Sequence, residues 1–238
     1  MNDFKKNNIT LDLDNHEYKL MNNPELVFTS VTTCIEYFFE GFNAQKIAKK
    51  LITNYPKYSQ YTVESLIAEW NASADYGTRV HDEIEKWIKF GDEPNDRKAI
   101  HGKEWIERQF SKSDSDLFSE IIIYSEELAI AGTIDLIVKN NVTGEYDIFD
   151  WKTSKKIETI SYGNKMGTHE VTKDVMDCNF YHYSLQLSLY RYILENYYNI
   201  KINRQYIAHL KNDGVDILPT SYMSNEIIAM LKSIKTEK

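Results

Sequence analysis

Apolar residues recur at helical spacing through most of the first half of the chain. The segments VTTCIEYFF, AQKIAKKLI and VESLIAEW show this spacing, and each follows a residue whose side chain can cap a helix. The candidate caps are Thr29 or Ser30, Asn43 and Thr62. A separate pattern that includes Val80 and Ile84 predicts a helix over 76–90, and a further helix is expected around 97–110.

The middle of the chain changes to short segments typical of β-strands. SEIIIYS, AGTIDLIVKN and EYDIFDWK are rich in β-branched and aromatic residues and are separated by turn residues, so they predict an antiparallel meander. After a loop over 155–176 we expect an aromatic helix over 178–198, two strands joined by a turn at 212–214, and a closing helix from Ser224. The fold class expected is α/β, in the broad sense that includes α+β, with a central mixed β-sheet flanked by helices.

Nothing in the sequence marks a linker, a repeat or a low-complexity tract, so we expect a single domain over 1–238. Residues 1–24 are polar and are expected to form a loose arm or a short strand pair. Residues 25–115 are expected to form a mainly helical region, and residues 116–238 a sheet core that includes the aromatic helix.

The composition, with 42% hydrophobic and 27% charged residues, is that of a folded globular protein. A net charge of −8 argues against a protein that holds nucleic acid by bulk electrostatics. The charge is unevenly distributed, because residues 75–135 carry 8 basic and 15 acidic side chains whereas residues 151–211 carry 9 basic and 5 acidic ones. A stretch that can hold cations therefore precedes one that can face phosphates.

Several classes of protein are disfavoured. No apolar run is long enough for a membrane span, and the start of the chain lacks the apolar stretch of a signal peptide, so we expect a cytoplasmic protein. The two cysteines, Cys34 and Cys178, are too few for a disulfide framework or a four-cysteine iron–sulfur cluster. No glycine-rich phosphate-binding loop is present, so no ATP site is expected. Oxygen and nitrogen ligands would have to hold any metal.

Three charged residues on the predicted central strands indicate chemistry. Asp150 and Lys152 are two apart in FDWKTSK, so they share one face of a strand, while Phe149 and Trp151 point to the other. If the preceding strand pairs with this one, Asp135 approaches the same place. Converging carboxylates suit a hard divalent cation, and a lysine beside it can orient or deprotonate water or offset charge on a phosphate. The alternative is a salt bridge at a strand end.

Two helical pairs add to this set. His81 and Glu85 are four apart on one face of a predicted helix, and so are Gln186 and Tyr190 on the aromatic helix. Imidazole can complete a metal shell. Taken singly, His81 could be a structural histidine, and the second pair could serve only in packing.

In chain order, GTRVH, AGTID, the Asp-x-Lys of FDWKTSK and Gln-x-x-x-Tyr resemble the motifs of the PD-(D/E)XK nuclease superfamily, specifically its RecB-like branch of exonucleases. The resemblance covers residues 77–190, and a looser similarity to compact phage and mitochondrial single-strand exonucleases reaches back to residues 30–32. Ile134 stands where the superfamily name has proline. The resemblance implies a restriction-endonuclease-like core and phosphodiester hydrolysis that leaves a 5′-phosphate and a 3′-hydroxyl.

The resemblance also implies roles for individual residues. His81, Asp135 and Asp150 would be metal ligands, joined by the backbone carbonyl of Trp151. Lys152 would be the catalytic lysine and would act together with the two aspartates.

Further residues would support this centre or bind substrate. Gln186 and Tyr190 would line the active site and contact DNA, while Glu85 and Glu120 are candidates for supporting the metal shell or a second cation. Basic residues near the motifs are candidates for phosphate contacts: Arg79, Lys155, Lys156, Lys165 and Arg191. The 17 tyrosines and 4 tryptophans offer rings on which unpaired bases could stack.

The sequence therefore predicts a DNA exonuclease that depends on Mg²⁺, with Mn²⁺ as an alternative, and that acts on single-stranded DNA or DNA ends. The setting expected is phage-type replication, recombination or degradation in the host cytoplasm, and a single-strand-binding, recombination or replication protein is a candidate partner. Two alternatives stay open: a nuclease-like subunit that binds DNA ends or a partner without cutting, and an endonuclease of the same superfamily.

Overall fold

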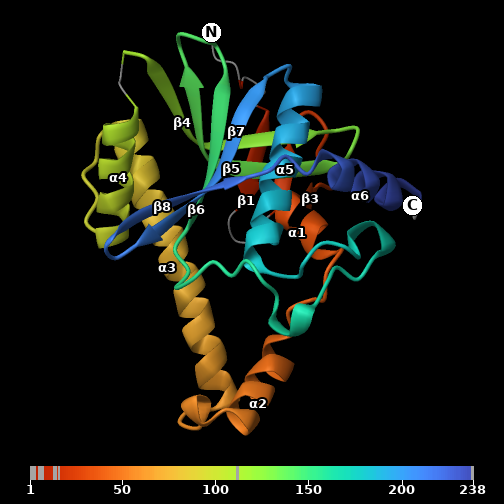
Figure 1. Ribbon diagram of the computed structural model, residues 1–238. Helices are drawn as coiled ribbons and strands as arrows, with labels where there is room; N and C mark the ends of the chain where they lie inside the picture. Colours follow the sequence, from red (N-terminus) through yellow and green to blue (C-terminus); the bar gives the residue numbers. More distant parts are fainter. Residues whose placement is uncertain (1–3, 5–7, 13–14, 16, 111–112, 237–238) are drawn as a thin grey trace.

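The structure is a computed structural model and describes residues 4, 8–12, 15, 17–110 and 113–236. A mixed sheet of six strands forms its centre, and helices cover both faces (Figure 1). This arrangement confirms the expected α/β fold class. Within the described residues, no helix is both long and apolar enough to cross a membrane.

The helices fall into a group before the sheet and a group after or between its strands. The first group is α1 (Val31–Glu36), α2 (Ala44–Asn54), the 3₁₀ turn η1 (Pro56–Tyr58), α3 (Val63–Phe90) and α4 (Arg97–Gln109). The second is η2 (Tyr162–Asn164), η3 (Glu170–Thr172), α5 (Asn179–Tyr197) and α6 (Ser224–Thr236). Ser30, Asn43 and Thr62 cap α1, α2 and α3 with their side chains, as their sequence positions predict.

One helix differs from the prediction. The two expected helical segments are joined in α3, which runs without interruption for 28 residues. The connecting residues 71–75 contain neither proline nor glycine, and Ala72 and Ala74 favour the helix, so nothing breaks the backbone hydrogen-bond ladder there. The N-terminal part of α3 packs beside α2, and together these helices project from the sheet as an arm (Figure 1).

The strands form a hairpin and a larger sheet. The hairpin joins β1 (Ile9–Asp12) to β2 (Glu17–Leu20), so the strand pair is the correct alternative for the polar N-terminal segment. The larger sheet contains β3 (Thr29–Ser30), β4 (Ser115–Ser125), β5 (Ile130–Asn140), β6 (Tyr146–Lys152), β7 (Ile202–Lys211) and β8 (Gly214–Thr220). Strands β4, β5 and β6 form the predicted antiparallel meander, β7 pairs parallel to β6, and β8 pairs antiparallel to β7.

Strand β5 has a fork along one of its edges. One edge of β5 pairs with β4. The opposite edge pairs with β3 at residues 130–131 and with β6 at residues 136–139. Residues 132–135 therefore lack a strand partner on that edge. Asp135 lies at the end of this unpaired stretch, next to β6.

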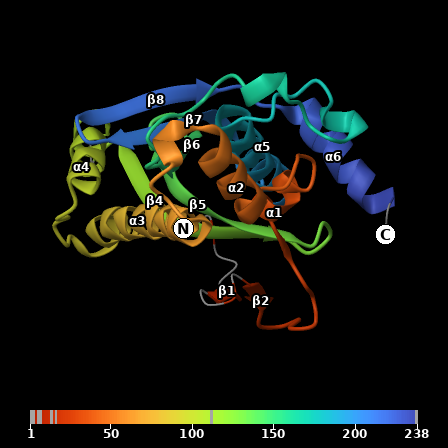
Figure 2. The ribbon, with the colours of Figure 1, turned by 90° about the horizontal axis from the view of Figure 1, so that it is seen from below.

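Two apolar clusters fix the layers on either side of the sheet. On one face, α3 and α4 pack through Val80, Ile84 and Trp105 against residues of β5, β6 and β7. On the other face, residues of α1, α5 and α6 pack against the same strands. Figure 2 shows the same layers from below, with β1 and β2 set apart from the main sheet. Both faces of the sheet are apolar and pack against helices. Helices α3 and α5 therefore lie on opposite sides of the sheet at the fork.

Candidate metal centre

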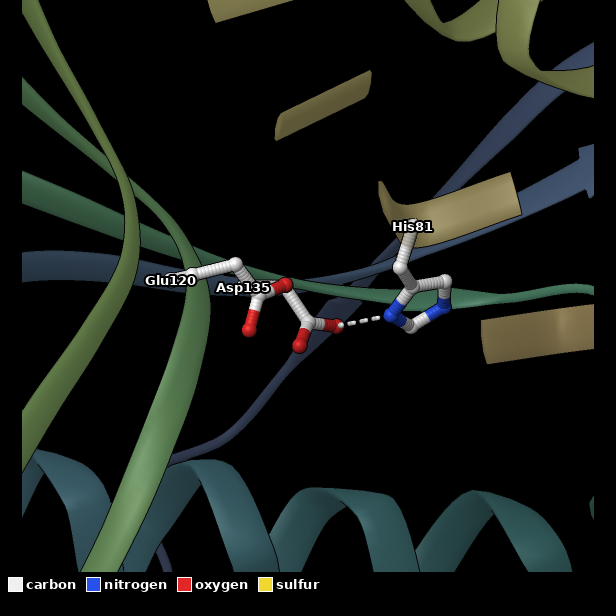
Figure 3. A group of neighbouring side chains, drawn as sticks. All are labelled: His81, Glu120 and Asp135. Carbon is white, nitrogen blue, oxygen red and sulfur yellow. Dashed lines mark ion pairs between the residues drawn. The ribbon is translucent and has the colours of Figure 1, made fainter. Parts of the chain in front are cut away.

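Helix α3 brings His81 to the sheet. Val80 and Ile84 are fully buried against the sheet, which fixes the rotation of the helix and turns the neighbouring His81 toward β5. The Nδ1 atom of His81 lies 3.6 Å from Oδ2 of Asp135 (Figure 3). Residues distant in sequence thus meet at the fork.

Glu120 on β4 lies across from Asp135 on β5. The register pairs Ser119 with Leu136 and Ile121 with Ile134, which places Glu120 and Asp135 opposite each other. Glu120 has a φ of 51°, an uncommon conformation for a residue other than glycine and one often found at functional sites. The two carboxylates point toward one another in Figure 3.

Strand β6 supplies the other charged pair. The Nζ atom of Lys152 lies 2.7 Å from Oδ2 of Asp150, and it lies 4.4 Å from the ring centre of Tyr183 on α5. Phe149 and Trp151 pack on the opposite face, in the cluster with α3 and α4. Strand alternation therefore separates the charged and apolar side chains as the sequence predicts.

The backbone of β6 contacts Asp135 where the two strands diverge. The N–H of Trp151 donates to Oδ2 of Asp135 at 2.7 Å. The pairing between β5 and β6 ends at Leu136 and Phe149. Beyond this pair, the Asp135 side chain accepts the hydrogen bond from β6. This bond ties Asp135 to the strand that carries Asp150 and Lys152.

Helix α5 reaches the same group through its Gln-x-x-x-Tyr residues. The Nε2 atom of Gln186 donates to Oδ1 of Asp150 at 3.0 Å and to the hydroxyl of Tyr190 at 3.2 Å. Gly132 lets the helix approach, because a Cβ atom there would lie 2.6 Å from Cε1 of Tyr190 and 2.9 Å from Cγ2 of Val31. Gln186 therefore donates a hydrogen bond to Oδ1 of Asp150, while Lys152 forms an ion pair with Oδ2.

The acids of this group have unusual proton affinities. Burial, reinforced by the charges of Asp135 and Glu85, raises the pKa of Glu120 to about 9. Burial also raises the pKa of Asp150 to about 6, although Lys152 opposes the shift. Burial disfavours the charge of Asp135 as well, but His81, Lys152 and the Trp151 N–H outweigh it and lower its pKa.

The acids raise the pKa values of the two bases. Burial disfavours the imidazolium of His81, yet the charge of Asp135 and a hydrogen bond to it raise the pKa of His81 above its ordinary value. Burial likewise opposes the ammonium of Lys152, and the charges of Asp150 and Asp135 raise its pKa overall. The five side chains therefore shift one another's proton affinities.

A metal ion fits this arrangement. His81, Glu120 and Asp135 each offer one ligand atom, and these atoms lie within 4.8 Å of one another. One imidazole and two carboxylates form a suitable ligand set for a divalent cation. Asp150 Oδ2 is buried, and the Lys152 ammonium lies 2.7 Å from it. Burial raises the pKa of the Glu120 carboxyl to about 9, and a cation bound beside it would favour its ionised form.

The sequence-predicted residues are distributed unevenly around this group. Glu120, expected only in a supporting role, belongs to the group of ligand atoms, whereas Asp150 lies beside it and contacts Lys152 and Gln186. Trp151 enters the site by its backbone N–H.

Three other candidates lie around the group rather than in it. Glu85 is ion-paired with Lys89 one turn along α3. Arg79 is exposed, with its guanidinium 5.7 Å from the ring centre of Tyr76, and Lys155 is exposed in the loop after β6. Among the described residues, no hydrogen bond or ion pair joins Arg79 or Lys155 to the metal-binding group.

Two tyrosines near the site were not predicted. Tyr18 on β2 places its hydroxyl 3.0 Å from Oγ1 of Thr133, and the charges of Glu120 and Asp135 contribute to raising its pKa, after burial. No local signal marks Tyr18, because its role depends on how the hairpin docks. Tyr183 is three residues before Gln186, so helical spacing could have identified it.

Comparison with known proteins gives limited information. No protein-family model matches the chain, and no curated protein matches its sequence. A solved structure of a protein called SSO0001 is 11% identical, covers 89% of this chain and 76% of its own, and gives a TM-score of 0.40. A structure titled as a "Putative exonuclease" from Eubacterium rectale is 14% identical, covers 88% and 79%, and gives a TM-score of 0.38. At these values the likenesses carry no argument about function.

Proposed function

We propose that this chain is a metal-dependent deoxyribonuclease that hydrolyses phosphodiester bonds in single-stranded DNA or at DNA ends. The observation that supports it best is the convergence of ligand atoms from His81, Glu120 and Asp135 beside the Asp150–Lys152 pair. The ordered motifs of the sequence support the same conclusion independently. Their resemblance to compact phage exonucleases supports a place in phage-type DNA replication, recombination or degradation.

The chemistry follows from the charges around the fork. A divalent cation held there, Mg²⁺ or Mn²⁺, would supply Lewis acidity to a phosphate oxygen and to a water. Lys152 stays protonated because Asp150 and Asp135 raise its pKa, so its ammonium offsets charge that grows on the phosphate and orients water. Oδ2 of Asp150, beside the Lys152 ammonium, can accept a hydrogen bond from that water, while Gln186 fixes Oδ1. Attack by the water would leave a 5′-phosphate and a 3′-hydroxyl.

Cleavage of labelled DNA in Mg²⁺ or Mn²⁺ tests the proposal. We expect linear DNA with free ends to be degraded, closed circular DNA to resist, and EDTA to abolish the reaction. Lys152→Ala should lower the rate at least about a hundredfold, the usual effect of losing a group that acts in the transition state. Lys201→Ala is the matched control, because Lys201 is exposed and ion-paired with Glu145, which precedes β6 at the end opposite to Lys152.

The other outcomes are equally informative. Cleavage of closed circles would favour the endonuclease alternative, and DNA binding with no cleavage would favour the non-cutting subunit. Asp135→Asn should weaken metal binding itself, whereas Lys152→Ala should leave it largely intact. Substantial activity in both variants would contradict the proposal.

A further inference from the structure

The arm formed by α2, η1 and the start of α3 differs in charge from the rest of this acidic protein. Residues 43–63 contain four lysines and no acidic residue, although the whole chain has a net charge of −8. All four are exposed: Lys46, Lys49, Lys50 and Lys57. None of them has a carboxylate within ion-pair distance among the described residues. Helix α2 and η1 thus carry an excess of positive charge, whereas the acidic residues of the arm, Glu64 and Glu69, lie on the start of α3.

Several lysines elsewhere are ion-paired. Ion pairs join Lys201 to Glu145, Lys211 to Asp216 and Lys235 to Glu127. On α2, by contrast, Lys46, Lys49 and Lys50 stand at i, i+3 and i+4 and share one face. Like charges four apart destabilise a helix, so the fold itself gains nothing from this spacing. The arrangement suits an anionic ligand.

Aromatic rings lie among these charges. The hydroxyl of Tyr55, at the end of α2, is 3.0 Å from the hydroxyl of Tyr162 in η2, and Lys50 Nζ lies 5.8 Å from the Tyr162 ring centre. Tyr162 keeps 76% of its surface exposed. The arm therefore meets the loop after β6 at a point where cations and an open ring face lie together. We call Lys46, Lys49, Lys50, Lys57, Tyr55 and Tyr162 the arm patch.

We infer that the arm patch binds single-stranded DNA at a distance from the metal centre. Lysines can contact phosphates, and exposed rings can stack with unpaired bases, which is the combination used by proteins that hold single strands without reading sequence. Duplex DNA offers the phosphates but not the base faces. The inference rests on the proposed function, because it names where the same substrate is held outside the site that cuts it.

Helix α3 separates the tip of the arm, near η1, from the metal centre. His81 comes 18 residues after Val63, so the arm's tip lies roughly 27 Å along the helix from the metal centre. A stacked strand would span this distance with about eight nucleotides. A trinucleotide is too short to reach from the metal centre to the tip.

Binding of a labelled 20-nucleotide strand tests the inference without relying on cleavage. The measurement uses the full chain carrying Lys152→Ala, so that the probe stays intact. Lys46→Gln, Lys49→Gln and Lys50→Gln together should weaken binding roughly tenfold at low salt. The slope of log K against log salt should fall by about 2, since each phosphate contact on a single strand contributes about 0.7. The control replaces Lys201, Lys211 and Lys235 by Gln, which removes the same charge elsewhere.

Two substitutions at Tyr162 test the aromatic part. Tyr162→Leu should weaken single-strand binding at least roughly fivefold, while leaving duplex binding unchanged. Tyr162→Phe keeps the ring and loses only the bond to Tyr55, so it should bind like the parent. The stacking role would be overturned if both variants lost the same affinity for single-stranded DNA. It would also be overturned if Tyr162→Leu lost as much affinity for duplex as for single-stranded DNA.

The inference and the proposed function can fail separately. If the two triple variants bind the strand equally well, the arm patch is not a DNA site, whatever the chain cleaves. Binding of anionic phospholipid vesicles by the parent but not the arm variant, with strand binding unchanged, would assign the patch to a membrane surface and overturn the inference. With active protein, the arm variant should lose activity on the 20-nucleotide strand and keep it on a trinucleotide.

Discussion

The carboxylate of Glu120 joins His81 and Asp135 in one group of ligand atoms. Glu120 also has a φ of 51° and a pKa raised to about 9 by burial and nearby acids. A strained backbone and a carboxyl that resists ionisation are both costs to the metal-free protein, and bound metal would offset the second.

A pH dependence follows for the metal-free protein. A carboxyl whose pKa is raised in the folded state favours folding at low pH and loses that advantage as pH rises from its ordinary value of 4.5 to about 9. The raised pKa of His81 acts in the same direction above neutrality. We therefore expect Tm in EDTA to fall between pH 6 and pH 9. Thermal unfolding of Glu120→Gln should show a flatter fall, and an unchanged slope in that variant would contradict this role for Glu120.

Gln186 makes a second prediction at the level of one side chain. Its Nε2 donates to the buried Asp150, so Gln186→Leu leaves Asp150 Oδ1 without that donor. Urea unfolding should show a loss of about 1–3 kcal/mol, the usual cost of an unsatisfied buried group. Tyr190→Phe is the comparison, because it removes only the hydroxyl that accepts from Gln186. A Gln186→Leu protein as stable as the parent would show that the bond to Asp150 carries little weight.

At the scale of elements, the sheet changes its side-chain alternation at the metal centre. Phe118 and Ile121 on β4 pack in the cluster with α1 and α5, and so do Ile134 and Ile137 on β5. In both strands these residues are three apart, where regular alternation needs an even number. The change surrounds Glu120 and its left-handed φ. The irregularity thus places the carboxylate pair at the fork.

Gly132 gives a prediction for the contact between β5 and α5. Gly132→Ala should destabilise the protein by about 1–3 kcal/mol, as overpacking of a core does, because the added Cβ would overlap Tyr190 and Val31. The control variant is Gly41→Ala, because a Cβ atom at that position has no neighbouring atom within 4 Å. Equilibrium unfolding compares the two, and equal stabilities would show that the close approach of α5 is not required.

The elements that the sequence predicted are those set by local chemistry. Side-chain caps at Ser30, Asn43 and Thr62 and the alternation that separates Asp150 from Trp151 depend on neighbouring residues alone. The fork, the change of alternation at Glu120 and the docking of Tyr18 depend on contacts between distant segments, so periodicity carries no sign of them. The continuity of α3 was missed because two apolar patterns were treated as two helices.

At the scale of the whole molecule, the site requires both faces of the sheet to be covered. Helix α3 brings His81 from one face and α5 brings Gln186 from the other, while β4, β5 and β6 carry the acids and Lys152 between them. Metal binding should therefore stabilise the whole fold. We expect saturating Mn²⁺ to raise Tm by several degrees and to do so more at pH 8 than at pH 6, since the cation then competes with fewer protons. Asp135→Asn should abolish this shift, and a shift of the same size in that variant would contradict the site.

Diffraction from crystals soaked in Mn²⁺ tests the central claim most directly, because anomalous scattering locates the ion. We predict one strong peak enclosed by the ligand atoms of His81, Glu120 and Asp135, and its loss in Asp135→Asn crystals. Soaked crystals with no peak at this place, or with manganese bound only at surface carboxylates, would contradict the account.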